Sequence, residues 1–306
     1  MNAFAAALLP IMVLIFLGYG LKRARFLPEQ SWTGIEKLTY YLLFPALLIR
    51  SLGRQTLAGA PWSEMLWVVV GVLLAAAVLL LFAHRLHAFS DGPRFTSLFQ
   101  GGIRFNTYIA LAAAQGLYGA EGLALGSIAA GFMIVLINLL CVSVFMVWGK
   151  VQFKGVVPFV RKLLSNPLII ACCIGWSLSL SGIGVPGIAT DILEIIGRAA
   201  LPFGLLAVGA ALQPQALLGH FPAIAISALV QFGVKPLFVW LLIIYFGLTG
   251  VAAGVLIIAF MTPTAPSAYI LARQLGGDTE SMASIITFQT LLALLVMPLI
   301  AWLLLR

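Results

Sequence analysis

Ten apolar segments, each about as long as a membrane-spanning helix, take up most of this 306-residue chain. A helix needs about 20 apolar residues to cross the hydrocarbon core of a bilayer. The segments lie near residues 4–21, 33–50, 64–83, 94–117, 122–148, 157–180, 187–212, 222–245, 250–274 and 281–304. Transmembrane strands alternate apolar and polar residues, whereas these segments run apolar without alternation. The sequence therefore predicts an all-α polytopic membrane protein with ten transmembrane helices.

Composition excludes the main alternatives to a membrane protein. Hydrophobic residues make up 62% of the chain and charged residues only 8%. Soluble domains contain about 45–50% apolar and about 25% charged residues. Because too few polar residues remain to cover a water-exposed surface, soluble enzymes, nucleic-acid-binding modules, coiled coils and disordered chains are excluded. The net charge of +8 comes from basic residues scattered between the apolar segments, so the expected partner is the lipid bilayer and not a nucleic acid.

Basic residues between the segments predict the orientation of the chain in the membrane. They gather in alternate connections, for example at Lys22, Arg23 and Arg25 in the first and at Lys150 and Lys154 in the fifth. Cytoplasmic loops carry an excess of lysine and arginine. With ten spans, this pattern predicts a multi-pass protein with both termini on the extracytoplasmic side.

The two halves of the chain resemble each other. The residues from Leu43 to Leu48 are similar to those from Ala200 to Leu205, and the segment from Gln115 to Glu121 aligns with that from Gln274 to Glu280. Two halves of five spans each must be inverted relative to one another, which is how many secondary transporters are built. We expect an N-terminal repeat over 1–148, a short cytoplasmic linker over 149–156 and an inverted C-terminal repeat over 157–306.

The fourth and ninth segments are polar and interrupted near their middles. Gly101 and Gly102 precede a run of polar residues in the fourth, and Pro263 and Pro266 each remove a backbone donor in the ninth. In hydrocarbon a helix is broken only where the freed backbone faces protein or a water-filled cavity. The amino ends of half-helices carry partial positive charge, and two such ends near the midplane typically hold a carboxylate.

We therefore expect a substrate site at these two interruptions. Its candidate binding residues are Arg104, Asn106, Thr107, Tyr108, Thr262, Thr264, Ser267 and Tyr269, and its helix-breaking residues are Gly101, Gly102, Pro263 and Pro266. The Arg104 guanidinium has the geometry to bind a carboxylate, or it extends to the membrane interface. Asn106 either binds the substrate or forms a hydrogen bond between neighbouring helices. Tyr108 and Tyr269 either bind the substrate or pack against neighbouring side chains.

Other polar residues within the segments are Glu36, Lys37, Asn138, Glu194, Arg198, Lys235 and Gln289. The four charged residues of the second and seventh segments form structural ion pairs or take part in proton coupling. Asn138 and Gln289 are expected to form hydrogen bonds between helices. Lys235 precedes Pro236 and is either an interface residue or one member of an ion pair.

Around these residues the sequence resembles the auxin efflux carrier family, in particular its bacterial members, often described as malate or malonate carriers. The stretch from Arg104 to Ile109 is similar to the Asn-Thr-Tyr core of the fourth helix in the plant members. The resemblance also includes Pro10 to Gly20, Leu38 to Leu48 and Thr262 to Tyr269, and it covers nearly the whole chain.

The resemblance implies a ten-helix, five-plus-five inverted repeat, a fold shared with the bile-acid:sodium symporters, in which broken helices 4 and 9 cross. It implies a scaffold of helices 1, 2, 6 and 7, a moving transport domain of helices 3–5 and 8–10, and a homodimer formed through the scaffold. The family's asparagine in helix 4 corresponds to Asn106. A second asparagine, in helix 9 of the plant carriers, has no counterpart in the ninth segment, where Thr264 and Ser267 are the nearest polar residues.

The resulting hypothesis is an elevator-type secondary transporter or efflux carrier in a bacterial inner membrane. Its substrate would be a small organic anion such as malonate, malate or an auxin-like acid. No cofactor is expected, and H⁺ or Na⁺ remains open as a coupling ion. The alternatives are a sodium-coupled uptake symporter of the bile-acid type and a membrane sensor that binds without transporting. An enzyme is not expected, because the segments contain no Ser/His or Asp/Asp arrangement and no metal-binding cluster.

Overall fold

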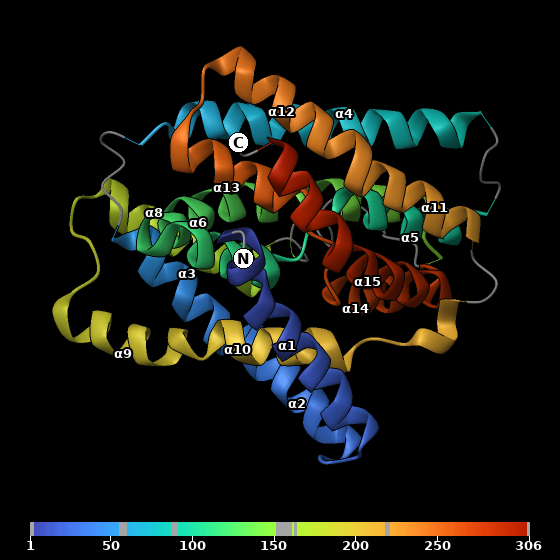
Figure 1. Cartoon of the computed structure of the whole chain (residues 1–306), viewed down its shortest axis with the longest axis horizontal. Coiled ribbons are helices and arrows are strands. Elements are labelled where there is room, and N and C mark those ends of the chain that lie inside the picture. Colours follow the sequence, from blue (N-terminus) through green and yellow to red (C-terminus); the bar gives the residue numbers. More distant parts are fainter. Residues whose placement is uncertain are drawn as a thin grey trace.

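The computed structural model describes residues 3–54, 60–86, 91–150, 161, 164–217 and 221–304. Within these ranges every regular element is a helix (Figure 1). The first half contains α1 (Ala3–Arg23), α2 (Glu29–Leu38), η1 (Thr39–Leu43), α3 (Phe44–Gly53), α4 (Trp62–Arg85), α5 (Gly92–Ile103) and α6 (Thr107–Trp148). The second half contains α8 (Pro167–Leu180), α9 (Gly187–Arg198), α10 (Ala200–Ala210), η2 (Pro214–Leu217), α11 (Phe221–Leu229), η3 (Val230–Val234), α12 (Lys235–Phe246), α13 (Gly250–Phe260), α14 (Ser267–Leu275) and α15 (Thr279–Leu304). Most of the predicted linker, 151–156, and the start of the sixth predicted segment lie outside the described residues.

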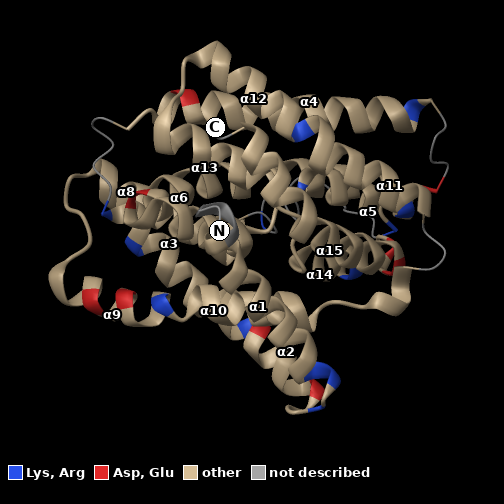
Figure 2. Ribbon diagram, viewed as in Figure 1, with Lys and Arg blue, Asp and Glu red and all other residues tan. Residues whose placement is uncertain are grey.

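Among the described residues, six stretches of helix are long and apolar enough to cross a membrane. They are Ala6–Arg23, Trp62–Arg85, Gly92–Trp148, Gly187–Ala210, Phe221–Phe246 and Thr279–Leu304, and the shorter helices α8 and α13 are also apolar. Many large apolar side chains on these helices face outward, among them Trp67, Val78 and Leu295. Charged residues lie mainly toward the helix ends (Figure 2). An apolar exterior of this kind suits lipid and not water, so the predicted all-helical membrane protein is confirmed at this level.

The stretch from Gly92 to Trp148 is not one continuous rod. Its helix stops after Ile103 and restarts at Thr107, and Gly119 has a φ of 61° inside α6. A left-handed backbone at Gly119 interrupts the helix and turns the chain, a conformation that glycine adopts without a steric penalty. Beyond the turn, a Cβ on residue 122 would lie 2.2 Å from the Ala114 carbonyl oxygen. The chain therefore folds back on itself, and α6 consists of two packed segments.

The helices pack as two groups. In the first, α1 packs against α10, and α3 packs against α8 and α9; in the second, α6 packs against α13, α5 against α11 and α15, and α4 against α12. Figure 1 shows α1, α2, α9 and α10 on one side of the molecule and α4, α11 and α12 on the opposite side. The two groups are joined through α6, which also contacts α1, α3, α8 and α10.

Two helices contain a π-helical turn just before a proline. The turn η1 joins α2 to α3 and ends two residues before Pro45, and η3 joins α11 to α12 and ends two residues before Pro236. Proline cannot donate the backbone hydrogen bond that the preceding helical turn needs. Because π-helical turns re-aim side chains within a helix and often occur at functional sites, the residues of η1 and η3 are followed below.

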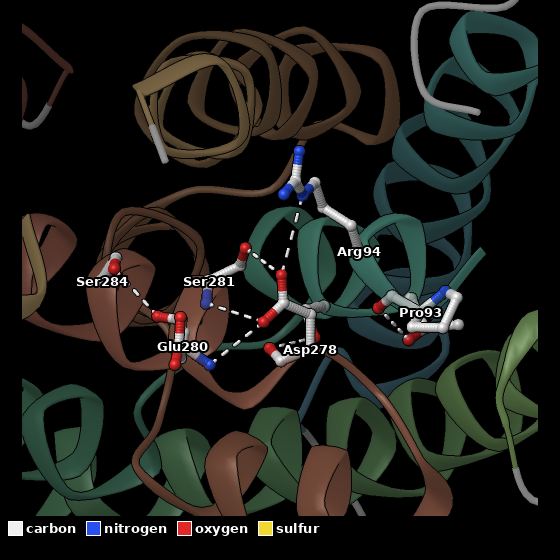
Figure 3. Close-up of polar contacts among 8 residues, drawn as sticks. Pro93, Arg94, Asp278, Glu280, Ser281 and Ser284 are labelled. Carbon is white, nitrogen blue, oxygen red and sulfur yellow. Dashed lines mark hydrogen bonds and ion pairs between the residues drawn. The ribbon is translucent and has the colours of Figure 1, made fainter. Parts of the chain in front are cut away.

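Asp278 ties the start of α15 to the start of α5 (Figure 3). Its carboxylate accepts hydrogen bonds from the backbone N–H groups of Glu280 (3.1 Å) and Ser281 (3.2 Å), so it caps α15. Its own N–H donates to the Pro93 carbonyl (3.1 Å), and its carboxylate lies 3.7 Å from the Arg94 guanidinium. The amino ends of these two helices are therefore held together.

The close packing of α1 on α10 leads to a stability prediction. A Cβ on Gly18 would lie 2.1 Å from the Leu206 carbonyl oxygen, whereas a Cβ on Gly20, in the same helix, would meet nothing within 4 Å. Alanine is favoured over glycine within a helix by up to about 1 kcal/mol, but overpacking costs about 1–3 kcal/mol. We expect Gly18→Ala to lower the melting temperature of the purified protein and Gly20→Ala to leave it unchanged or raise it. Equal melting temperatures for the two variants would contradict this packing.

Candidate functional site

The two helix interruptions meet inside the molecule. One is the extended segment between α5 and α6, and the other is the connection between α13 and α14. The backbone N–H of Asn106 in the first donates to the Thr262 hydroxyl in the second (3.3 Å). From α15, the Gln289 carboxamide accepts from the Thr264 N–H (2.9 Å) and donates to the Gly101 carbonyl (2.9 Å). Backbone groups freed by both breaks are thereby satisfied within the protein, as a break in a membrane helix requires.

Asn106 shapes the first interruption. Its backbone is extended, and its side-chain oxygen accepts from the N–H groups of Tyr108 (3.1 Å) and Ile109 (3.2 Å), so Asn106 is the N-cap of α6. Within the described part of the chain, the buried Asn106 Nδ2 and the buried Thr264 hydroxyl oxygen have no hydrogen-bond partner. Each retains hydrogen-bonding capacity that another group could use.

The backbone carbonyls that precede or lie in the two breaks are bound by two side chains, Gln231 from η3 and Lys235 from α12. Lys235 is fully buried, and its ammonium donates to the carbonyls of Ile103 and Arg104 (both 3.2 Å) and to the Gln231 side-chain oxygen (2.7 Å). The Gln231 amide in turn donates to the Thr262 carbonyl. Both predictions for Lys235, an interface residue or a member of an ion pair, are wrong, because neutral oxygens inside the protein bind it.

Arg104 is also held inside the protein. Only 8% of the residue is exposed; its Nε donates to the Gln100 side-chain oxygen (2.9 Å) and its Nη2 to the Asn138 side-chain oxygen (3.2 Å). The interpretation in which Arg104 extends to the membrane interface is therefore wrong. Gln289 forms a hydrogen bond between helices, as predicted, since it donates from α15 to Gly101 of α5. Asn138 instead joins α6 to Arg104 in the extended segment and to Ile134 of its own helix. In the described residues neither Arg104 nor Lys235 is paired with a carboxylate, so both leave uncompensated positive charge near the breaks.

A small pocket lies beside the junction of the two breaks. It has a cavity volume of about 50 Å³, room for a few water molecules. Thr107 and Tyr108, at the start of α6, line it together with Pro266 and Ser267, at the start of α14. The amino ends of two half-helices therefore open into the same pocket. Backbone N–H groups and the helix dipole favour an anion at such a place.

The structure separates the predicted site residues into two sets. The pocket is lined by Thr107, Tyr108, Pro266 and Ser267. The other predicted residues do not line it; they are Gly101, Gly102, Arg104, Asn106, Thr262, Pro263, Thr264 and Tyr269. All of this second set except Tyr269 are buried in or next to the breaks. Gly101 and Gly102 are packed tightly there, because an added Cβ would lie within 3 Å of Ile285 or Leu80.

Sequence analysis did not place several residues in this region that the fold brings there, including Glu36, which it had named only as an ion-pair or proton-coupling candidate. Glu36, Thr39 and Tyr40 line the pocket, the last two from the π-helical turn η1, and Phe44 stacks edge-on against the Tyr108 ring (centroids 4.9 Å apart). Gln231 lies in the other π-helical turn, η3. A proline shortly after a polar residue in an apolar segment is the signal that the sequence offered for these turns.

Of the charged residues in the second and seventh predicted segments, one pair is structural. Glu194 accepts hydrogen bonds from Arg198 (2.5 Å) and, from α3, Arg50 (2.7 Å). This confirms the structural interpretation of Glu194 and Arg198. Glu36, in contrast, faces the pocket.

Comparison with known proteins identifies the family. The family model described as membrane transport protein matches residues 3–301. The chain belongs to this family. The family is auxin-efflux-carrier-like, so the resemblance noted from the sequence is confirmed. As a member of the membrane transport protein family, the protein is a multi-pass membrane transporter and not an enzyme. In the part of the chain that the structure describes, no three His, Cys, Asp or Glu residues gather as a metal site.

Two relatives align with nearly the whole chain. An uncharacterized transporter of Methanocaldococcus jannaschii is 24% identical, with 97% of each chain covered. An uncharacterized transporter of Methanothermobacter thermautotrophicus is 22% identical, with 95% of each chain covered. A more limited similarity links the chain to the ileal sodium/bile acid cotransporter of Oryctolagus cuniculus, which is 32% identical over 37% of this chain and 33% of the cotransporter.

Proposed function

We propose that this membrane transporter is a secondary transporter or efflux carrier of small organic anions, carboxylates such as malonate, malate or auxin-like acids. The observation that carries the proposal is the pocket into which the amino ends of α6 and α14 both open. Thr107 and Ser267 supply hydroxyl groups at its wall. The buried cations Arg104 and Lys235 add positive potential, which acts over longer distances in a low-dielectric interior than in water.

The pocket is too small for a dicarboxylate, so the proposal includes a change of conformation. When the pocket opens, the Asn106 amide and the Thr264 hydroxyl offer the donors that fix the carboxylate's orientation. Neither atom has a hydrogen-bond partner among the described residues. Each belongs to a residue whose neighbour in the sequence lines the pocket. The Arg104 guanidinium would then exchange part of its amide partners for the carboxylate.

We further propose a ten-helix fold of two inverted five-helix repeats, 1–148 and 157–306, joined by the linker 149–156, with helices 4 and 9 crossing at the breaks. Supporting this, α6 starts at Thr107 and α14 at Ser267, each just after an interruption at a similar place in its half. The scaffold would be α1–α3 and α8–α10, and the transport domain α4–α6 and α11–α15, following the two packing groups. The transport domain would move as an elevator, in a homodimer, in a bacterial inner membrane with both termini extracytoplasmic.

A flux experiment tests the anion proposal. We expect purified protein in liposomes to move labelled malonate, malate or indole-3-acetate, with the potential, pH and sodium gradients varied one at a time. Transport of one anion that responds to the membrane potential or a proton gradient supports the proposal. Binding without flux under every gradient would favour the sensor hypothesis. If the protein neither binds nor transports any of these anions, an organic anion is refuted as the substrate.

A second candidate is a sodium-coupled uptake symporter of organic anions. The observation in its favour is the partial similarity to proteins named as sodium-dependent carriers, including the sodium-dependent organic anion transporter of Bos taurus, 36% identical over 34% of this chain. This candidate predicts that flux stops when choline replaces sodium. The carrier proposed first predicts that flux is the same in sodium and in choline.

A further inference from the structure

The pocket lies between the two packing groups of helices. One wall comes from the first group and includes Phe44 of α3 with Ala207 and Val208 of α10. The other wall comes from the starts of α6 and α14 in the second group. Tyr108 has the largest side chain of this second wall. A substrate held between the walls therefore lies against the Tyr108 ring.

The Tyr108 ring fits into a slot on the first group. It stacks edge-on against Phe44, with ring centroids 4.9 Å apart. On α10, a Cβ added to Gly204 would lie 2.5 Å from Tyr108 Cδ1 and 2.6 Å from its Cγ. Gly204 lies inside α10, where alanine is the more favourable residue for a helix. The ring that packs on this glycine explains its presence, and the slot has the width of one aromatic ring.

The same ring lies beside the place proposed for the carboxylate. Tyr108 belongs to the first turn of α6, and its backbone N–H donates to the Asn106 side chain that caps this turn (3.1 Å). Because the ring and the amino end of α6 are parts of one helical turn, they stay together when the two walls move apart. The rest of a substrate attached to the bound carboxylate therefore competes with the Tyr108 ring for space.

We propose that Tyr108 is a specificity-determining residue that excludes aromatic acids from this site. A compact aliphatic carboxylate fits beside the ring, whereas an acid that carries its own ring needs the space that Tyr108 fills. The inference rests on the proposed function and narrows its substrate class. Removing the ring should open a slot, lined by Phe44 and Gly204, that accepts the ring of a substrate.

The chain offers a matched set of variants. Tyr108→Ala empties the slot, and Tyr245→Ala is the control, since Tyr245 of α12 is 80% exposed and does not line the pocket. Gly204→Ala adds a methyl group to the slot and should lower the melting temperature, because overpacking forces the ring out of place. In a protein that already carries Tyr108→Ala, the same change should cost little, because the ring that the methyl group would meet is gone.

Melting temperatures measured with and without phenol test the slot without a transported substrate. Phenol is the group that Tyr108→Ala removes, and a small aromatic molecule can fill the cavity left by a buried side chain. We expect phenol to raise the melting temperature of Tyr108→Ala by at least about 2 °C relative to its effect on the wild type, because a ligand that binds the folded state stabilises it. Tyr245→Ala should respond to phenol as the wild type does, and the double variant should gain less than Tyr108→Ala.

Flux in liposomes tests the selectivity itself. The wild type should transport malonate or malate in preference to phenylacetate, and Tyr108→Ala should shift the ratio of the two transport efficiencies toward phenylacetate by at least about tenfold. Tyr245→Ala should leave this ratio unchanged.

The outcomes separate this inference from the transport proposal. A wild type that transports phenylacetate as efficiently as malonate and malate would overturn the inference, even if no variant can be purified. A folded Tyr108→Ala that phenol does not stabilise would overturn it as well. If no anion is transported, the proposed function fails, but the phenol experiment still decides whether the place of the Tyr108 ring accepts an aromatic ligand.

Discussion

Replacing Arg104 by glutamine is expected to lower the transport efficiency for the organic anion by at least about tenfold, since a hydrogen bond to a charged group contributes about 1.5–3 kcal/mol. Glutamine keeps a polar side chain next to Gln100 and Asn138 but removes a buried charge that no carboxylate neutralises in the described residues. The anion is the group expected to neutralise it. Initial flux rates over a range of anion concentrations in liposomes measure the effect.

Two comparisons make the Arg104 result interpretable. Arg104→Lys keeps the charge without the planar fork and should retain more transport than the glutamine variant. Arg54→Gln, at an exposed position after the end of α3, should transport as the wild type does. If Arg104→Gln transports the anion with wild-type rate and affinity, the positive charge at the break is dispensable, and Arg104 does not bind the substrate.

Replacing Gln289 by leucine is expected to reduce stability more than any other single change proposed for this protein. The Gln289 carboxamide is buried and pairs with one backbone group from each break, the Thr264 N–H and the Gly101 carbonyl. Each buried group left without a partner costs about 1–3 kcal/mol. The melting temperature should therefore fall by about 5–20 °C, because two groups lose their partners and about 1 kcal/mol corresponds to about 2–4 °C in domains of 150–250 residues, and flux should fall with it.

Gln115→Leu is the matched control, because the same substitution is made at an exposed position of α6. It should melt close to the wild type. Gln289→Glu keeps an acceptor for Thr264 but loses the donor to Gly101, so its melting temperature should lie between those of the wild type and Gln289→Leu. A Gln289→Leu protein as stable as the wild type would mean that the two breaks are not joined through this residue.

The positions of the two helix breaks were predictable from the sequence. Glycine pairs, closely spaced prolines and polar side chains interrupt a helix locally, and the segment around Asn106 and the segment from Pro263 to Pro266 carry these signals. The apolar segments likewise predicted an all-helical membrane protein, because exposure to lipid demands apolar side chains wherever the chain lies in the bilayer.

The partners of the polar side chains were not predictable in the same way. The sequence left Lys235 as an interface residue or an ion-pair member, and it left Arg104 free to reach the interface, because each side chain is long enough for either. Neighbouring helices decided between these possibilities: oxygens from α5 and η3 surround the Lys235 ammonium, and Gln100 and Asn138 hold Arg104. Glu36 lines the same pocket as the start of α6 because of the way α2 packs against α10.

The sequence by itself determined that the chain is a helical membrane protein, where its helices break, and which polar residues accompany the breaks. These properties depend on residues close together along the chain, since helix propensity, proline geometry and burial in lipid act locally. The tertiary structure alone decided that Asn106 meets Thr262, that Gln289 joins both breaks and that Lys235 faces the carbonyl ends. These contacts join residues far apart in the chain, and they follow from which helices pack side by side, which an apolar pattern shared by every helix does not specify.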